Sequence, residues 1–359
     1  MAKALYGEVS PYSATRLERF AACAFAHFLQ YGMKLTERVE YEFKPMDMGN
    51  VMHEALESFA EEVRKRGMKW TELTEQERNE IADRCLDNIV ADYGNTVLKS
   101  SARNEYMIER TRRILRRTVW ALQKQLEQGE FQPEGFEVTF GGGRIDRVDI
   151  MEDQNKVYVK VIDYKTGNTS FDLVYLYHGL QLQLMIYLDG ALRVEQKKYP
   201  DKEIIPAGVF YYNIKDPMIQ EKIDADVKAV SAGLMKELKM NGLVQADPEL
   251  VYRMDSSLGS IPVAFNKDGS FRKNSSVADR TQFAVLGRYV RTKIEKIRSS
   301  ILEGDAEVSP YELGKKNACT YCPYMTVCGF DRRLLGYEFR RLKNFSDEEL
   351  WKAFDREAE

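Results

Sequence analysis

The stretch 141–167, GGGRIDRVDIMEDQNKVYVKVIDYKTG, constrains the fold more than any other part of the sequence. Two alternating runs rich in Val, Ile and Tyr flank the turn-like EDQNK, a pattern that predicts an antiparallel β-hairpin. If the turn is centred between Gln154 and Asn155, Asp146 lies directly opposite Asp163. Opposed side chains have Cβ atoms about 4.5 to 5.5 Å apart, so two acids there repel each other unless a cation neutralises them.

The residues beside Asp163 suit such a cation. Lys165 shares the face of Asp163 because side chains alternate along a strand, whereas Tyr164 points to the other face and leaves its carbonyl near the acids. Two carboxylates and a carbonyl favour a hard cation such as Mg²⁺ or Mn²⁺. An isolated D-x-K triplet is more typical of solvent-facing positions on a surface hairpin. The matched position of Asp146 and the apolar flanks of both strands favour a metal site.

Composition and charge narrow the class of protein. The chain has 359 residues, of which 44% are hydrophobic and 30% are charged, as in ordinary globular proteins. A net charge of −3 gives no overall basic signature of nucleic-acid binding, so such a function must depend on local patches. The longest mostly apolar run, FAACAFAHFL, is about half a bilayer span, and no signal peptide is recognisable. We therefore expect a cytoplasmic protein without membrane contact.

The periodicity of apolar residues predicts an α/β fold with a mixed sheet flanked by helices. Strands are expected within 135–166 and in IIPAGVFYYNI, and a hairpin around the turn 267–269. Helices are expected over about 13–33, 48–66, 75–98, 103–129, 174–195, 222–241 and 278–303. The chain divides into a helical part, a core and a cysteine-rich part that together form one integrated domain, over 1–134, 135–245 and 246–359.

Five cysteines without an export signal argue for free thiols or metal ligands rather than disulfides. Cys319, Cys322 and Cys328 form a C-x2-C-x5-C run, and Cys23 is the candidate fourth ligand, which would join the two ends of the chain. Zinc and a 4Fe-4S cluster both accept four thiolates, so the spacing leaves the two open. Cys85 has no such company and is expected to be a small buried residue.

Residues 103–125 carry six Arg and one Lys against two Glu on an expected helix. Such a stripe can hold a phosphate backbone without reading bases, although a solvated helix face has the same composition. The candidate DNA-binding residues are Arg112, Arg113, Arg116 and Arg117. No P-loop sequence occurs, so the chain has no nucleotide-driven motor of this type.

Four sequence elements in a fixed order resemble the RecB-like branch of the PD-(D/E)xK nucleases. They are GNVMH with His53, GRIDRVD with Asp146, VIDYKTG with Asp163 and Lys165, and QLMIY with Gln183 and Tyr187. The first acid follows Ile rather than the Pro of the family name. The resemblance implies the restriction-endonuclease-like fold and metal-dependent hydrolysis of phosphodiester bonds.

The same resemblance implies a role for each of these residues. The metal ligands would be His53, Asp146, Asp163 and the carbonyl of Tyr164. Lys165 would orient or help to deprotonate the attacking water and stabilise the charged transition state. Gln183 and Tyr187, four positions apart on one helix face, would hold Lys165 or the DNA backbone.

The ends of the chain, SATRLERFAACAFAHFL and CTYCPYMTVCGFD, resemble the AddB family of bacterial helicase–nuclease subunits. This resemblance implies a structural 4Fe-4S cluster on Cys23, Cys319, Cys322 and Cys328 and an AddA-type helicase–nuclease partner. It also implies a nucleoid-associated exonuclease that processes the 5′-ended strand at double-strand breaks for recombinational repair. Two alternatives are an inactive iron–sulfur-stapled DNA-binding scaffold and a zinc-stapled single-strand binder.

Overall fold

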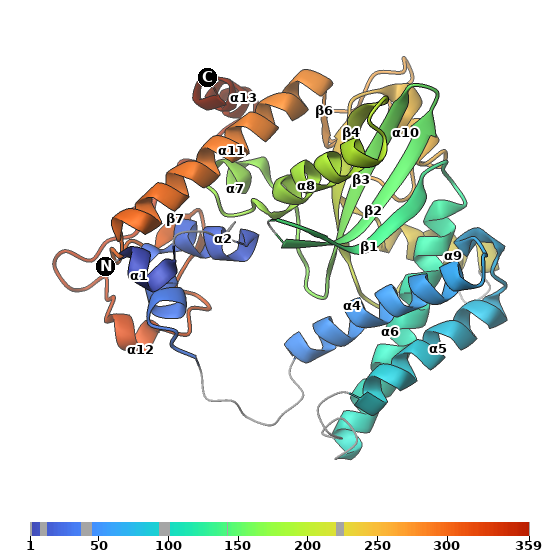
Figure 1. Ribbon diagram of the computed structural model, residues 1–359, viewed down its shortest axis with the longest axis horizontal. Helices are drawn as coiled ribbons and strands as arrows, with labels where there is room; N and C mark the ends of the chain where they lie inside the picture. Colours follow the sequence, from blue (N-terminus) through green and yellow to red (C-terminus); the bar gives the residue numbers. More distant parts are fainter. Residues whose placement is uncertain are drawn as a thin grey trace.

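A mixed six-stranded sheet forms the centre of the molecule (Figure 1). The computed structural model describes residues 2–7, 13–36, 45–92, 101–141, 143–219 and 226–358. The strands lie in the order β1-β2-β3-β4-β5-β6, with β3–β4 and β5–β6 parallel and the other neighbours antiparallel. Their bounds are Gln132–Phe140, Gly143–Asp153, Lys156–Lys165, Glu203–Asn213, Asn241–Gln245 and Val277–Ala278.

Helices cover both faces of this sheet and bury two separate hydrophobic cores (Figure 1). The first core joins the sheet to α4, α5, α6 and α10, and the second joins it to α2, α7, α8, α11 and α13. Their bounds are Pro45–Lys65, Glu75–Asp92, Ala102–Leu126 and Pro248–Met254, then Ala14–Ala22, Leu173–Tyr177, Gln183–Lys198, Arg280–Glu303 and Asp347–Ala358. Each core draws residues from all three predicted parts of the chain, so these parts pack on one common sheet.

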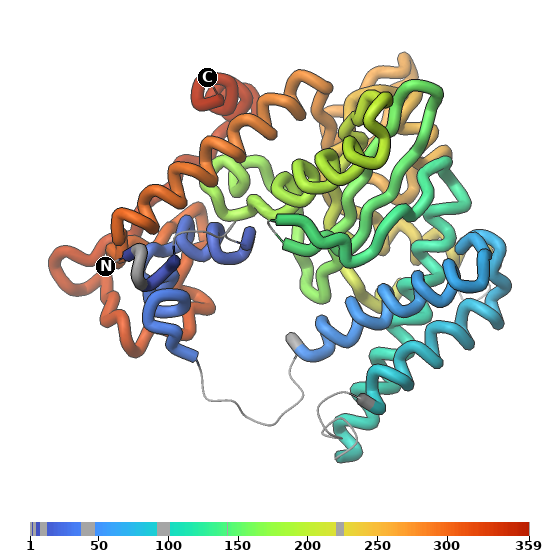
Figure 2. Tube along the Cα trace, viewed as in Figure 1, coloured from blue at the N-terminus to red at the C-terminus, as the bar shows by residue number. Residues whose placement is uncertain are grey.

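The N-terminal segment lies beside the cysteine-rich segment that follows α11, away from the sheet, whereas the C-terminal helix α13 packs against α11 (Figure 2). The backbone N–H of Phe25 donates to the carbonyl of Glu307, and the Arg340 guanidinium donates to the carbonyl of Ala21. The remaining short elements are α1, α3, the π-helix that follows α3, a 3₁₀ turn, α9, β7, β8, α12 and β9. Their bounds are Ala2–Tyr6, Ala24–His27, Phe28–Gly32, Trp70–Glu72, Val227–Glu237, Tyr311–Leu313, Lys316–Asn317, Met325–Cys328 and Arg340–Arg341.

The predicted hairpin and its register are confirmed. Arg147 pairs with Ile162 and Val148 with Val161, and the turn lies at 154–155. One step further along this ladder, Asp146 stands opposite Asp163. The hairpin expected around 267–269 is also present, as an antiparallel bridge between Phe265 and Phe271.

The single helix predicted over 174–195 is wrong. The chain forms α7 and then α8, because Gly179 takes a left-handed conformation with φ of 78° and ends the first helix. Parts of two other predicted helices lie outside the described residues. They are 93–98 of the helix expected at 75–98 and 222–225 of the helix expected at 222–241. This helix ends early, at Glu237, and is followed by the unpredicted strand β5, which lies between β4 and β6 in the sheet.

The terminal helix α13 was also not predicted. Ser346 and Glu349 cap its start, since the backbone N–H of each donates to the side chain of the other. Leu350, Ala353 and Phe354 bury one face of the helix in the second core. Among the described helices, none is long and apolar enough to cross a bilayer.

Candidate metal centre

Three acids stand in a row across β1, β2 and β3. Asp146 lies opposite Asp163, and the pairs Phe136–Arg147 and Val138–Ile145 place Glu137 opposite Asp146 on its other side. Asp146 and Asp163 are buried, at 8% and 1% exposure. Adjacent carboxylates at this depth are unfavourable without positive charge among them.

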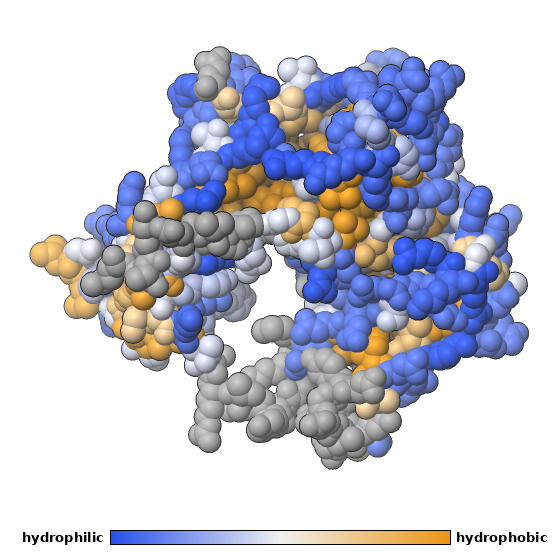
Figure 3. All heavy atoms as spheres, viewed as in Figure 1, coloured by the Kyte–Doolittle hydropathy of each residue, from blue (hydrophilic) through white to orange (hydrophobic). Residues whose placement is uncertain are grey.

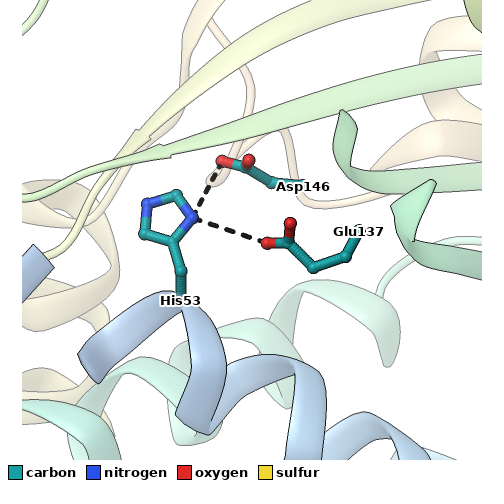
Figure 4. Close-up of side chains that lie close together, drawn as sticks. All are labelled: His53, Glu137 and Asp146. Carbon is teal, nitrogen blue, oxygen red and sulfur yellow. Dashed lines mark ion pairs between the residues drawn. The ribbon is translucent and has the colours of Figure 1, made fainter. Parts of the chain in front are cut away.

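His53 supplies one such charge from α4 (Figure 4). Its Nδ1 lies 3.4 Å from Oδ2 of Asp146 and 3.7 Å from Oε1 of Glu137, and its Nε2 lies 3.1 Å from the carbonyl oxygen of Tyr164. Burial alone would lower the pKa of His53, but the hydrogen bonds and charges of Asp146 and Glu137 outweigh it and raise this pKa to about 10. His53 is therefore a cation here, at the point where the carboxylates converge.

The backbone of Tyr164 is held against these acids as well. Its N–H donates to Oδ2 of Asp146 at 2.7 Å, and its side chain packs in the first core. The carbonyl of Tyr164 consequently faces the histidine rather than the sheet interior. The helix α4 is fixed in the same core by its buried residues Val51, Met52, Ala55 and Leu56.

Lys165 lies on the other side of Asp163. Its Nζ is 2.6 Å from Oδ2 of Asp163 and donates to Oε1 of Gln183 at 2.8 Å. The Nε2 of Gln183 in turn donates to the hydroxyl of Tyr187 at 2.9 Å. Burial first, and then the charge of Asp146, raise the pKa of Asp163 to about 7, although Lys165 favours its charged form. The structure thus brings together every residue that the sequence assigned to this centre.

The side chains present fit a divalent cation. His53, Glu137 and Asp146 each offer one ligand atom, and these atoms lie within 4.8 Å of one another. The open cleft above them is also lined by Asp163, Lys165 and Gln183, so a bound ion would be accessible to a substrate. Glu137 was not predicted. The alternation of FEVTF opposite RID could have indicated it, had β1 been registered against β2.

The four predicted cysteines lie on two segments, between α2 and α3 and from the end of β8 through α12. These segments are at the lower left of Figure 3. One small, mostly apolar pocket is lined by Cys23, Cys319, Cys322 and Cys328. Burial, and then the other three thiols, raise the pKa of Cys319 to about 11. Deprotonated thiols are ligands of zinc and of iron–sulfur clusters, and a metal centre on these four cysteines stays a prediction. Cys85 lies apart, buried in the first core as expected.

Comparison with known proteins gives the family. The sequence model of one protein family, the PD-(D/E)XK nuclease superfamily, matches residues 11–329. This range includes every residue of the metal centre and all four clustered cysteines. The chain belongs to this superfamily. The PD-(D/E)XK fold, with its mixed sheet flanked by helices, is therefore confirmed.

Curated relatives of this PD-(D/E)XK chain are named as subunits of an ATP-dependent helicase/deoxyribonuclease. The protein from Lachnoclostridium phytofermentans is 43% identical over 100% of this chain and 33% of its own length. That from Thermoanaerobacter sp. is 35% identical over 99% of this chain and 33% of its length, and that from Clostridium acetobutylicum is 35% identical over 98% and 32%. The chain thus spans about a third of the length of these relatives.

The predicted DNA-binding arginines of the PD-(D/E)XK chain lie on α6, and each has an acidic neighbour. Arg112 donates to Asp87 at 2.7 Å, and Arg116 is paired with Asp83, so these two tie α6 to α5. Arg113 and Arg117 lie 3.0 and 3.7 Å from Asp216. Their role in binding DNA stays a prediction.

Proposed function

We propose that the chain is the DNA-cleaving part of a helicase–nuclease subunit and hydrolyses phosphodiester bonds with Mg²⁺ or Mn²⁺. The proposal rests on one observation, the row of Glu137, Asp146 and Asp163 with Lys165 at its end in an open cleft. The names of the relatives, which include the word deoxyribonuclease, support DNA as the substrate.

The metal would be held by side chains from α4 and the first three strands. We assign to it His53, Asp146, Asp163 and the carbonyl of Tyr164, and add Glu137. A divalent ion bound there supplies a water of lowered pKa and offsets the charge that grows on the phosphate oxygens. His53 must lose its proton to become a ligand, because a protonated imidazole has no free lone pair.

Lys165 is placed to act on the attacking water. Its ammonium group lies at the acids yet is partly exposed to the cleft, with Gln183 accepting one of its three N–H bonds. A second N–H points to Asp163 in the 2.6 Å ion pair, which leaves the third for a water or a phosphate oxygen. Tyr187 fixes the amide of Gln183 and thereby the direction from which Lys165 approaches.

The four clustered cysteines would hold a 4Fe-4S cluster that joins the ends of the chain. Zinc is the alternative ion for four thiolates. A brown protein with a broad visible absorbance band that bleaches on reduction would support the cluster. A colourless protein with one bound zinc would contradict it.

The wider context of the proposal comes from the relatives. As subunits of ATP-dependent helicase–deoxyribonucleases, they suggest an AddA-type partner and a role in processing double-strand breaks during recombinational repair. We further propose exonuclease action on the 5′-ended strand. The α6 arginines would contact its phosphates without base specificity.

The decisive experiment is cleavage of end-labelled single-stranded DNA by anaerobically purified protein with Mg²⁺. We expect cleavage that disappears with EDTA and in Asp163→Ala, with product ladders from each labelled end reporting the polarity. Protein that retains its cluster and binds DNA without cutting it, alone and with its helicase partner, would favour an inactive scaffold instead.

A further inference from the structure

We infer that Glu18 is a positioning residue of this nuclease site. Its carboxylate caps the first turn of α8 and so holds the side chain of Gln183 within hydrogen-bond distance of Lys165. The inference rests on the proposed function, because positioning matters only if Lys165 takes part in catalysis. Neither the sequence motifs of the site nor its metal ligands include this glutamate.

The contact itself is a helix cap supplied from another part of the chain. Oε1 of Glu18 accepts hydrogen bonds from the backbone N–H of Leu182, at 2.7 Å, and of Gln183, at 3.0 Å. The first N–H groups of a helix have no partner within it, and Leu182 at the N-cap position provides none from its own side chain. A residue 164 positions earlier in the chain takes that place.

The cap acts on the reactive lysine through one residue. Gln183 is the first residue of α8, and its side chain accepts from Lys165 at 2.8 Å. A first turn without its cap frays, and the side chain of Gln183 would move with it. Lys165 would then lose its orienting partner while keeping its contact with Asp163.

The helix that carries Glu18 is firmly seated. Ser13 caps α2, and Leu17, Phe20 and Ala21 pack in the second core together with Leu184 and Met185 of α8. A negative charge at a helix N-terminus is favourable, and Lys165 also favours the ionised form of Glu18. Burial nevertheless raises the pKa of Glu18 to about 7. The carboxyl oxygen can accept the two N–H bonds in either state.

The test compares Glu18→Ala with Glu18→Gln in the same DNA-cleavage assay. The amide oxygen of glutamine can accept both backbone N–H bonds, whereas alanine cannot. We expect Glu18→Ala to lower kcat about 10- to 100-fold, with the KM for DNA and the affinity for Mg²⁺ unchanged within about twofold. Glu18→Gln should restore kcat to within about threefold of the original chain.

Asp279→Ala serves as the matched control for helix destabilisation. Asp279 caps α11 by accepting from the N–H of Gln282 at 2.8 Å, and this cap has no contact with Lys165. Its loss should lower stability by about 1 kcal/mol, the usual cost of a missing cap, and leave kcat unchanged. A fall in kcat equal to that of Glu18→Ala would mean that general destabilisation explains both, and would overturn the inference.

The outcomes separate this inference from the proposed function. If the original chain cuts DNA, Asp163→Ala does not, and Glu18→Ala cuts like the original, only the positioning role is wrong. If the original chain never cuts, the proposed function fails, and the crystal structure of Glu18→Ala then decides. A retained hydrogen bond between Gln183 and Lys165 in that variant would overturn the inference, and a displaced Gln183 would support it.

Discussion

The hairpin β2–β3 carries acids on both faces, and the side chains that surround these acids differ between the two faces. On the first-core face, Asp149 is fully buried and receives Arg147 at 2.5 and 2.9 Å and Lys160 at 3.0 Å. On the other face, Asp146 and Asp163 oppose each other, with Lys165 and the partly exposed His53 at the edge of a cleft. Asp146 and Asp149 are three positions apart on β2, yet Asp149 belongs to a fully buried ion cluster and Asp146 to one that opens to the cleft.

The pKa values of the acids shift in opposite directions on the two faces. Burial would raise the pKa of Asp149, but Arg147 and Lys160 outweigh it, so the pKa lies below its usual value. Burial and Asp146 raise the pKa of Asp163 to about 7. A carboxylate with complete protein partners is structural, whereas one held at a raised pKa in a cleft is poised for an external cation.

An Asp→Asn substitution on each face tests this difference most directly, because each removes one carboxylate charge. Asp146→Asn keeps the acceptor for the N–H of Tyr164 but removes the charge from the metal centre. We expect cleavage to fall about a thousandfold or more, roughly 4 kcal/mol of transition-state stabilisation, while the free energy of unfolding changes little. Single-turnover cleavage and urea denaturation measure the two quantities. Normal cleavage would remove Asp146 from the site.

Asp149→Asn should do the reverse. It leaves the Arg147 and Lys160 charges buried with only a neutral partner, and breaking a buried pair typically costs about 3 to 5 kcal/mol. We expect the urea midpoint to drop accordingly, with cleavage per folded molecule retained. An unchanged midpoint would show that the buried cluster contributes no net stability.

The response to Mg²⁺ should depend on pH. Without metal, the folded pKa of Asp163 near 7 exceeds its ordinary 3.8, so this carboxyl destabilises the fold above pH 7 and ceases to do so as pH falls towards 4. Mg²⁺ at about 100 times its Kd should add about 2.7 kcal/mol at pH 8 and less at pH 5, where the proton competes. Thermal unfolding with and without Mg²⁺ tests this. Equal Mg²⁺ stabilisation at both pH values would contradict it.

Glu137→Gln tests the edge of the open cluster with the smallest expected effect. We expect Mg²⁺ to bind about tenfold more weakly, about 1.4 kcal/mol, because one carboxylate near the ion is lost. Glu134→Gln is the control, since Glu134 lies on the same strand but pairs with Lys198. Calorimetric titration measures both affinities, and equal affinities would exclude Glu137 from the metal centre.

Much of the candidate site was predictable because its residues are close in sequence or lie in recognisable motifs. The alternation of two strands and a two-residue turn placed Asp146 opposite Asp163, and the same alternation put Lys165 beside it. Gln183 and Tyr187 lie one helical turn apart, so their mutual hydrogen bond also follows from local geometry. The terminal helix α13 was missed although its capping sequence, Ser346 to Glu349, is of a recognisable type.

The local pattern could be predicted from the amino-acid sequence, namely which residues share a strand face, which acids meet, and that four cysteines lie near the two ends of the chain. The GNVMH motif assigned His53 to the acids by resemblance, whereas the placement of Glu137 in their row and of Glu18 at the start of α8 follows only from the packing of the folded chain. Strand and helix periodicity act over a few residues. Contacts between segments that lie far apart depend on how helices pack on the sheet, and that packing follows from two shared cores rather than from any local pattern.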